Sequence, residues 1–194
     1  NRANGSPRDD GAMATIELAR TTGAGARAIL PLTPAVAAFG LTFGVLASEA
    51  GFDTLSVVVF SATTFAGSAQ FAATSVLSAG GTVAAAVLAA VLLNTRYVPI
   101  GISVAPALDG PTWKRFLRAQ LVVDESWVTA HLGGGRYDPS RLLGAGLVLY
   151  ATWVLSSGVG VAAGDAMGDP ETLGLDVAFP ALFLVVSLVL SFAA

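Results

Sequence analysis

The chain of 194 residues has no cysteine, a single histidine and few charged side chains. Without cysteine, disulfides, thiolate metal sites and cysteine nucleophiles are excluded. The net charge of −3 is too small and too dispersed to indicate a nucleic-acid partner. Charged residues form 12% of the sequence, hydrophobic residues form 54%, and the mean hydropathy is +0.72. Since soluble domains of this length lack such a composition, we expect an all-α integral protein of the lipid bilayer, with no metal site and no cofactor.

Polar breaks divide the sequence into long apolar runs. A helix needs about 20 apolar residues to cross a bilayer. The candidates lie at about 28–48, 55–78, 82–107, 115–132, 140–164 and 176–194. Residues 1–27 are polar and Gly-rich, which predicts a partly disordered tail before a membrane domain over 28–194. The chain opens on Asn1 and stops at Ala194 within an apolar run, so we expect it to be trimmed at both ends.

Proline and basic residues leave two topologies open. Pro99 and other prolines predict interrupted helices. Cytoplasmic links are enriched in Lys and Arg, so the arginine-bearing N-terminal tail is expected to be cytoplasmic. If every apolar run crosses, the link holding Lys114 and Arg115 falls outside, against this rule. If 55–78 and 115–132 both turn back within the membrane, every basic link is cytoplasmic. The length of 55–78 favours a crossing.

Hydroxyl side chains mark the second apolar run. Four of them would share one face of a continuous helix: Ser61, Thr64, Ser68 and Ser75. Gly67 weakens such a helix, and a break there would present free N–H groups to an anion such as a carboxylate. Hydrogen bonding between helices is the alternative for these hydroxyls. Elsewhere, Gly40 with Gly44 and Gly160 with Gly164 have the spacing of closely packed membrane helices.

Three charged residues lie in or beside apolar runs: Arg96, Asp124 and Glu125. A charge in hydrocarbon costs roughly 2.5–3.5 kcal/mol, so it normally faces a protein interior or a water-filled path. Pairing of Arg96 with Asp124 or Glu125 is the expected arrangement, and location at a segment end, with the charge reaching the interface, is the alternative. In a continuous fourth helix, one face would carry Gln120, Asp124, Trp127 and His131.

Three short motifs resemble the AzlC family, the large subunit of bacterial branched-chain amino-acid exporters. They are Phe65-Ala-Gly-Ser-Ala-Gln-Phe71, Leu93-Asn-Thr-Arg96 and Val123-Asp-Glu125. The resemblance covers roughly residues 28–190 and implies a multi-pass permease of the bacterial inner membrane. It also implies export driven by the proton-motive force, a small AzlD-type membrane subunit as partner, and a chain that continues beyond Ala194. Leucine, isoleucine and valine would be the substrates, with methionine a further candidate.

The resemblance also suggests functional positions. Those carried over are Gly67, Ser68, Gln70, Asn94, Arg96, Asp124 and Glu125. We expect Ser68, Gln70 and the backbone near Gly67 to hold the amino-acid head group, and Phe65 or Phe71 to contact the side chain. Asn94 is a further expected substrate-binding residue. Asp124 would carry the proton, with Arg96 as its electrostatic counterpart. The family pattern is only partly met, since Tyr97 follows the arginine and Val123 precedes the aspartate.

Other functions remain as alternatives. A non-transporting scaffold, a channel subunit or an exporter of another small substrate would fit the same composition. Ser157 and His131 could be imagined as the serine–histidine pair of an intramembrane hydrolase. No orienting carboxylate follows at a suggestive spacing, so the sequence predicts a protein that is not an enzyme.

Overall fold

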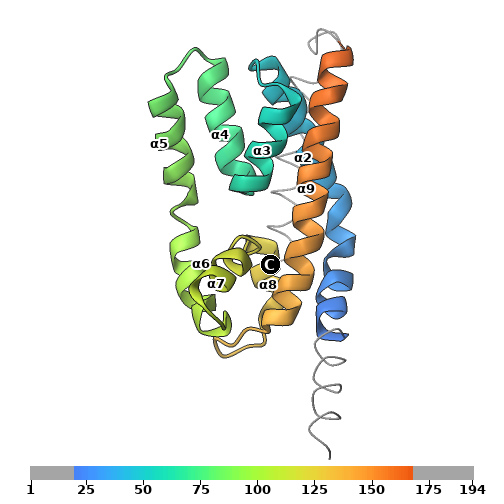
Figure 1. The fold of residues 1–194 in the computed structure, drawn as a ribbon, viewed down its shortest axis with the longest axis vertical. Helices are drawn as coiled ribbons and strands as arrows, with labels where there is room; N and C mark the ends of the chain where they lie inside the picture. Colours follow the sequence, from blue (N-terminus) through green and yellow to red (C-terminus); the bar gives the residue numbers. More distant parts are fainter. Residues whose placement is uncertain (1–19, 168–194) are drawn as a thin grey trace, which may run out of the picture.

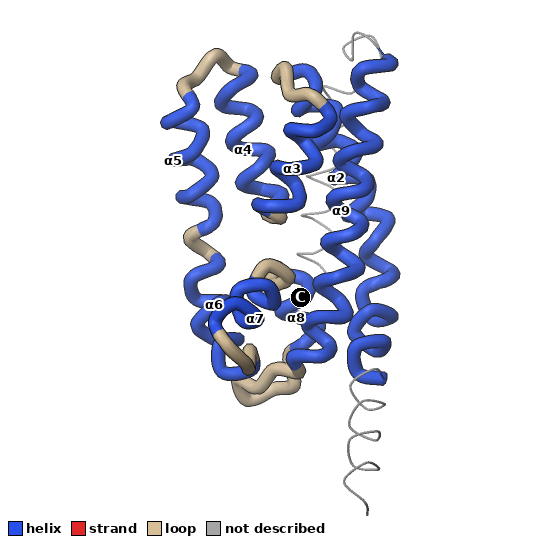
Figure 2. The backbone as a smooth tube through the Cα atoms, viewed as in Figure 1, coloured by secondary structure: helices blue, strands red, loops and turns tan. Residues whose placement is uncertain are grey.

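The computed structural model describes residues 20–167, and over this range it consists of helices joined by short loops (Figure 2). The predicted all-α membrane fold is confirmed. Within residues 20–167, two helices are long and apolar enough to cross a membrane, or three if one bent pair counts as a single span. The predicted run at 176–194 and most of the predicted tail lie outside the described residues.

Two long helices run side by side through the molecule (Figure 1). The first covers Arg20–Glu49 and includes a 3₁₀ turn, η1 (Leu30–Leu32), followed by α2 (Thr33–Glu49). Residues 20–27, which we predicted to be part of the tail, are therefore helical. The second is α9 (Pro139–Met167). Pro139 begins α9, where a missing N–H costs no helical hydrogen bond, whereas Pro31 lies in η1 and Pro34 just after it, where the first helix narrows to a 3₁₀ turn.

Glycines allow α2 and α9 to approach at backbone distance. A Cβ atom on Gly44 would collide with the carbonyl of Ser157, and one on Gly160 with the carbonyl of Leu41. A Cβ on Gly40 would meet the Ser156 hydroxyl. This is the close packing predicted from the spacing of the glycines, since lipid supplies no hydrophobic force between helices.

A matched pair of Gly→Ala variants tests this packing. Alanine normally stabilises a helix by about 0.5–1 kcal/mol relative to glycine. Gly101→Ala meets nothing within 4 Å and should raise the melting temperature slightly or leave it unchanged. Gly44→Ala must separate α2 from α9, and we expect it to destabilise the protein by about 1–3 kcal/mol. Thermal unfolding in detergent measures both, and equal midpoints would show that the close approach is not required.

The second apolar run folds as a helical hairpin made of α3 (Thr54–Thr64) and α4 (Gly67–Ser78). Asp53 caps α3 by accepting a 2.6 Å hydrogen bond from the Ser56 amide, which lowers the pKa of the Asp53 carboxyl. Phe65 ends α3 in the left-handed region, at φ 39°. Gly67 is needed at the turn, because a Cβ there would lie 2.8 Å from the Trp153 indole.

Both α3 and α4 extend between one end of the molecule and about its mid-height (Figure 1). The hydroxyl face predicted for one continuous helix is therefore interrupted, since the chain reverses between Thr64 and Gly67. The alternative of a broken helix is what the structure contains.

The remaining helices repeat this pattern of breaks. Helix α5 (Val83–Asn94) bends by 45° into α6 (Tyr97–Val104), which continues as the 3₁₀ turn η2 (Ala105–Ala107). Helices α7 (Thr112–Ala119) and α8 (Asp124–Ala130) flank a second reversal. The predicted face shared by Gln120, Asp124, Trp127 and His131 is wrong, because non-helical residues separate Gln120 from Asp124 and His131 lies past the end of α8.

The two hairpins enter from opposite ends of the molecule (Figure 1). One end, here called the acidic end, carries Glu49 and Asp53 beside the α3–α4 hairpin. The other, the basic end, carries the start of the first helix and the α7–α8 hairpin. Of the described basic residues, all but Arg96 belong to basic-end segments: Arg20, Arg27, Lys114, Arg115, Arg118, Arg136 and Arg141. This is the arrangement of the re-entrant alternative, which removes the conflict over Lys114 and Arg115.

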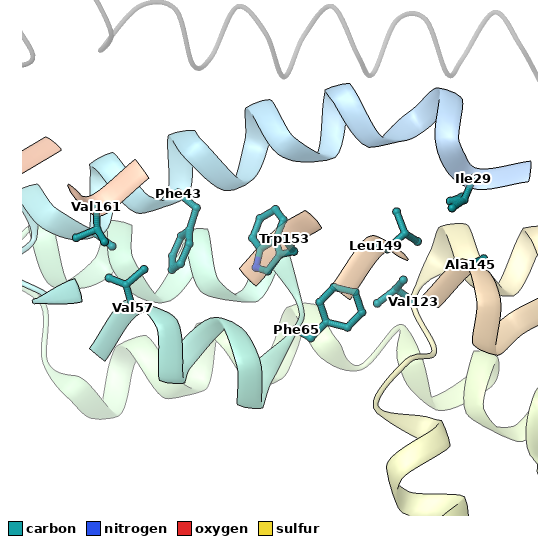
Figure 3. Close-up of a cluster of buried hydrophobic side chains, with 10 residues drawn as sticks. Ile29, Phe43, Val57, Phe65, Val123, Ala145, Leu149, Trp153 and Val161 are labelled. Atoms are coloured by element: carbon teal, nitrogen blue, oxygen red, sulfur yellow. The ribbon is translucent and has the colours of Figure 1, made fainter. Parts of the chain in front are cut away.

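The hydrophobic core fixes the tips of both hairpins against α9 (Figure 3). Phe65 comes from the α3–α4 turn and Val123 from the α7–α8 turn, and both belong to the cluster that contains Leu149 and Trp153 of α9. Phe43 of α2 is fully buried and stacks on Trp153, with ring centroids 5.9 Å apart. The non-helical turns are thus held by large apolar contacts rather than left to move freely.

Candidate functional site

Arg96 joins three interruptions of the helices near mid-height. It lies in the α5–α6 bend, where its Nη2 atom donates a 3.1 Å hydrogen bond to Oγ of Ser68, at the start of α4. The same atom lies 3.1 Å from Oδ2 of Asp124, at the start of α8, and 3.3 Å from the Tyr97 hydroxyl. The predicted internal pairing of Arg96 is confirmed, with Asp124 as the partner.

The ion pair is accessible as well as central. The side chains of Arg96 and Asp124 have 46% and 41% of their surface exposed. Asp124 follows Val123 of the hydrophobic core, and Arg96 bonds Ser68 beside the α3–α4 turn, so the alternative of charges reaching an interface does not describe this pair. Glu125 follows Asp124 in the first turn of α8, where negative charge is favoured by the helix dipole. Because the pair is exposed, an anionic group of a ligand could replace Asp124 as the partner of Arg96.

The N-terminal end of α4 adds an anion-binding feature beside Arg96. Ala66 precedes the helix and provides no side-chain cap, so the N–H groups of the first turn, at Gly67 and Ser68, have no capping partner there. Helix N-termini carry partial positive charge. With the guanidinium of Arg96 bound to Ser68, two positive features converge on one point. This is the broken-helix arrangement considered from the sequence.

The side chains of Gln70 and Phe71, both in α4, contact neighbouring helices and line neither of the cavities described below. Gln70 has no exposed surface, and both ends of its amide are used: Nε2 donates to Ser61 Oγ at 3.2 Å and Oε1 accepts from Trp153 Nε1 at 2.9 Å. Phe71 packs edge-on against Phe43. In this geometry Gln70 fastens α3, α4 and α9 together. Direct contact of Gln70 or Phe71 with a substrate stays a prediction.

Hydrogen bonds also tie the two hairpin tips to each other and to α9. Nε2 of Gln120, at the end of α7, donates to the Thr63 carbonyl at 2.7 Å. The Tyr150 hydroxyl donates to the Ala62 carbonyl at 2.8 Å. These carbonyls end α3 and would otherwise lack partners within the apolar interior. The tips therefore meet through polar contacts between the two hairpins and α9.

Two open cavities lie on either side of this contact. The basic-end cavity, of about 560 Å³, is bordered by the α3–α4 turn, α6 and α7, with Ala66, Tyr97 and Arg115 in its wall. The acidic-end cavity, of about 570 Å³, is bordered by α3, α4 and α5, and most of its wall is apolar, including Phe60 and Leu77. Thr64 and Asn94 line both cavities. Each is large enough for a small organic molecule.

Sequence reasoning missed Trp153 and Tyr150, which lie in the most apolar part of α9. Their indole N–H and hydroxyl groups hold Gln70 and the end of α3. A signal was present, since polar atoms of buried Trp and Tyr side chains almost always find partners. Their partners could not be named before the fold was known.

Comparison with known proteins places these motifs in a family. The sequence profile described as AzlC protein matches residues 31–167. Two Helicobacter pylori proteins, of strains J99 and 26695, are 26% identical over 149 residues, and each is named only as an uncharacterized membrane protein. These matches cover 75% of this chain, and the chain spans 65% of the length of those relatives.

A third relative has a more specific location in its name. Inner membrane protein YgaZ of Escherichia coli K12 is 27% identical over 173 residues, which cover 82% of this chain and 69% of YgaZ. No solved structure matches the sequence. The profile match covers most of the described residues, including all three breaks around Arg96. The chain is a membrane protein and belongs to the AzlC family.

Proposed function

We propose that the protein is a secondary transporter, not an enzyme, and that it exports branched-chain amino acids through the space around Arg96. The observation that carries this proposal is the convergence of three helix breaks on one guanidinium, together with two open cavities whose shared wall residues are Thr64 and Asn94. Interrupted helices near the membrane midplane are a common way for transporters to bind small ions and zwitterions. Leucine, isoleucine, valine and methionine combine a zwitterionic head with an apolar side chain.

The two parts of such a substrate fit different surfaces. The carboxylate would lie at Arg96 and the first turn of α4, where it could replace Asp124 as the partner of the guanidinium. The aliphatic side chain would enter the acidic-end cavity, whose wall is formed largely by Phe, Leu, Val and Ala side chains. Phe65 lines the basic-end cavity and could contact the side chain from there.

The same geometry supports Asp124 as the proton-coupling residue. A substrate carboxylate bound to Arg96 would leave Asp124 without its cationic partner. An unpaired carboxylate in a low-dielectric site favours proton uptake. Binding of the amino acid and protonation of Asp124 would then be linked, as coupled transport requires.

The proposal also includes an orientation in the membrane and a partner subunit. With the basic end in the cytoplasm, every described basic link follows the positive-inside rule, and the N-terminus is cytoplasmic in an inner membrane. The family resemblance adds a small AzlD-type membrane subunit. The surface of α5 is apolar, with Val87 and Leu88 more than half exposed, and could contact lipid or such a subunit.

Efflux from intact cells tests the proposed function. Cells expressing the full-length protein, with and without its small subunit, are loaded with peptides containing leucine, isoleucine or valine, and the amino acids that leave are measured. We expect faster efflux of all three only when both proteins are present, with loss of this efflux on adding an uncoupler. Unchanged efflux with both proteins confirmed in the membrane would contradict the proposal and favour a scaffold, a channel subunit or another substrate.

A further inference from the structure

Asn94 has a buried hydrogen-bond acceptor that nothing in the described part of the protein uses. It is the last residue of α5, and its Oδ1 atom has less than 1 Å² of accessible surface and no hydrogen-bond partner. A buried amide oxygen without a donor is costly, and native proteins rarely keep one without a reason. Two other described side chains have unpartnered buried atoms, Thr74 and Arg141, but neither lines a cavity described above.

The position of Asn94 connects it to both cavities and to Arg96. Asn94 lines the basic-end and the acidic-end cavity. It stands two residues before Arg96, on the other side of the α5–α6 bend. As the last residue of α5, it lies where the helix dipole contributes partial negative charge. The positive features at Arg96 and α4 thus have a negative counterpart a short distance along the chain.

We propose that the Asn94 side chain turns toward the cavities when the amino acid binds, and that its Oδ1 atom then accepts a hydrogen bond from the α-ammonium group. The inference rests on the proposed function and adds the second half of the amino-acid binding site. Arg96 and the first turn of α4 bind the carboxylate, and Asn94 binds the ammonium group. Because Asn94 borders both cavities, the ammonium group can stay bound while access changes from one end to the other.

A site of this kind discriminates against ligands that lack the amine. Removing the ammonium leaves the amide oxygen unpartnered again, so 4-methylpentanoate, the deaminated counterpart of leucine, should bind at least about tenfold more weakly than leucine. Asn94→Leu removes the acceptor. It should weaken leucine binding by about tenfold or more and leave 4-methylpentanoate binding within about twofold of wild type. Asn94→Asp keeps an acceptor for the ammonium group and should retain leucine binding.

Calorimetric titration of the full-length protein in lipid nanodiscs gives these affinities directly. Leu92→Ala, in the same turn of α5 but 60% exposed, is the matched control and should bind both ligands as wild type does. Equal loss of leucine and 4-methylpentanoate binding in Asn94→Leu, with binding retained in Leu92→Ala, would overturn the inference and assign Asn94 to the carboxylate. Unchanged leucine binding in Asn94→Leu would overturn it too, with the proposed function intact. Absence of leucine binding to wild type would overturn both.

Discussion

Replacing Arg96 with glutamine should reduce leucine efflux by about a hundredfold or more. The substitution removes the guanidinium that bonds Ser68 and Asp124 from a single atom, and with it the proposed carboxylate site. A hydrogen bond to a charged group contributes about 1.5–3 kcal/mol, which alone corresponds to a ten- to hundredfold loss of affinity. Loss of the link between the α4 and α8 breaks lowers the rate further. Efflux of labelled leucine from cells, normalised to the amount of protein in the membrane, measures the effect.

Further variants distinguish the effect of losing the Arg96 charge from the effect of losing folded protein. Arg136→Gln removes an exposed arginine from the loop before α9 and should leave efflux unchanged. Arg96→Lys keeps the charge but not the planar fork, and an intermediate rate is expected. In Arg96→Gln, Asp124 remains as an unpaired carboxylate, so adding Asp124→Asn should recover folded protein but not efflux. Efflux by Arg96→Gln near the wild-type rate would rule out a central role for the guanidinium.

Replacing Asp124 with asparagine should uncouple transport from the proton gradient. The amide can still accept a hydrogen bond from Arg96, which lies 3.1 Å from Oδ2 of Asp124, but it cannot take up or release a proton. In vesicles that contain the purified protein and its small subunit, exchange of internal for external leucine should continue. Net leucine movement should no longer speed up when a pH gradient is imposed, whereas the wild type should respond several-fold.

An acid-to-amide change at the acidic end is the control for Asp124→Asn. Asp53→Asn keeps the cap of α3, because asparagine can also accept the hydrogen bond from the Ser56 amide. Its response to a pH gradient should match that of the wild type. A gradient response that survives in a well-folded Asp124→Asn protein would show that another group carries the proton.

The spacing of apolar and small residues predicted much of the fold. The runs at 28–48, 82–107 and 140–164 became the helices able to span a membrane. The spacing of Gly40 and Gly44 predicted close helix packing, and the structure shows that the partner of α2 is α9. The rarity of charges in the apolar runs predicted that Arg96 pairs with Asp124 or Glu125, and Asp124 is the partner. Such features follow from the length of a bilayer-spanning helix and from the cost of an unpaired charge, which do not depend on the remaining fold.

The two reversals could not be derived in the same way. Periodicity assumes an unbroken helix, so it placed hydroxyls or polar residues on common faces that do not exist. The turn before α8 contains Leu121, Val122 and Val123, with neither glycine nor proline to mark it. It is fixed by Ser126, whose hydroxyl accepts from the Val123 amide and donates to the Leu121 carbonyl. The α3–α4 turn depends on Trp153, Tyr150 and Gln120, which are distant in sequence.

The re-entrant hairpins are the feature on which the proposed site depends, and cysteine accessibility tests them most directly. The chain has no cysteine, so single-cysteine variants report one position each. Thr54→Cys and Ser78→Cys lie at the two ends of the α3–α4 hairpin, and Thr112→Cys and Arg136→Cys lie at the basic end. With a membrane-impermeant maleimide on intact cells, we expect labelling of the first two and protection of the last two until the cells are opened. Labelling of only one of Thr54→Cys and Ser78→Cys from outside would show that 55–78 crosses the membrane, and would contradict the meeting of two half-crossing hairpins at Arg96.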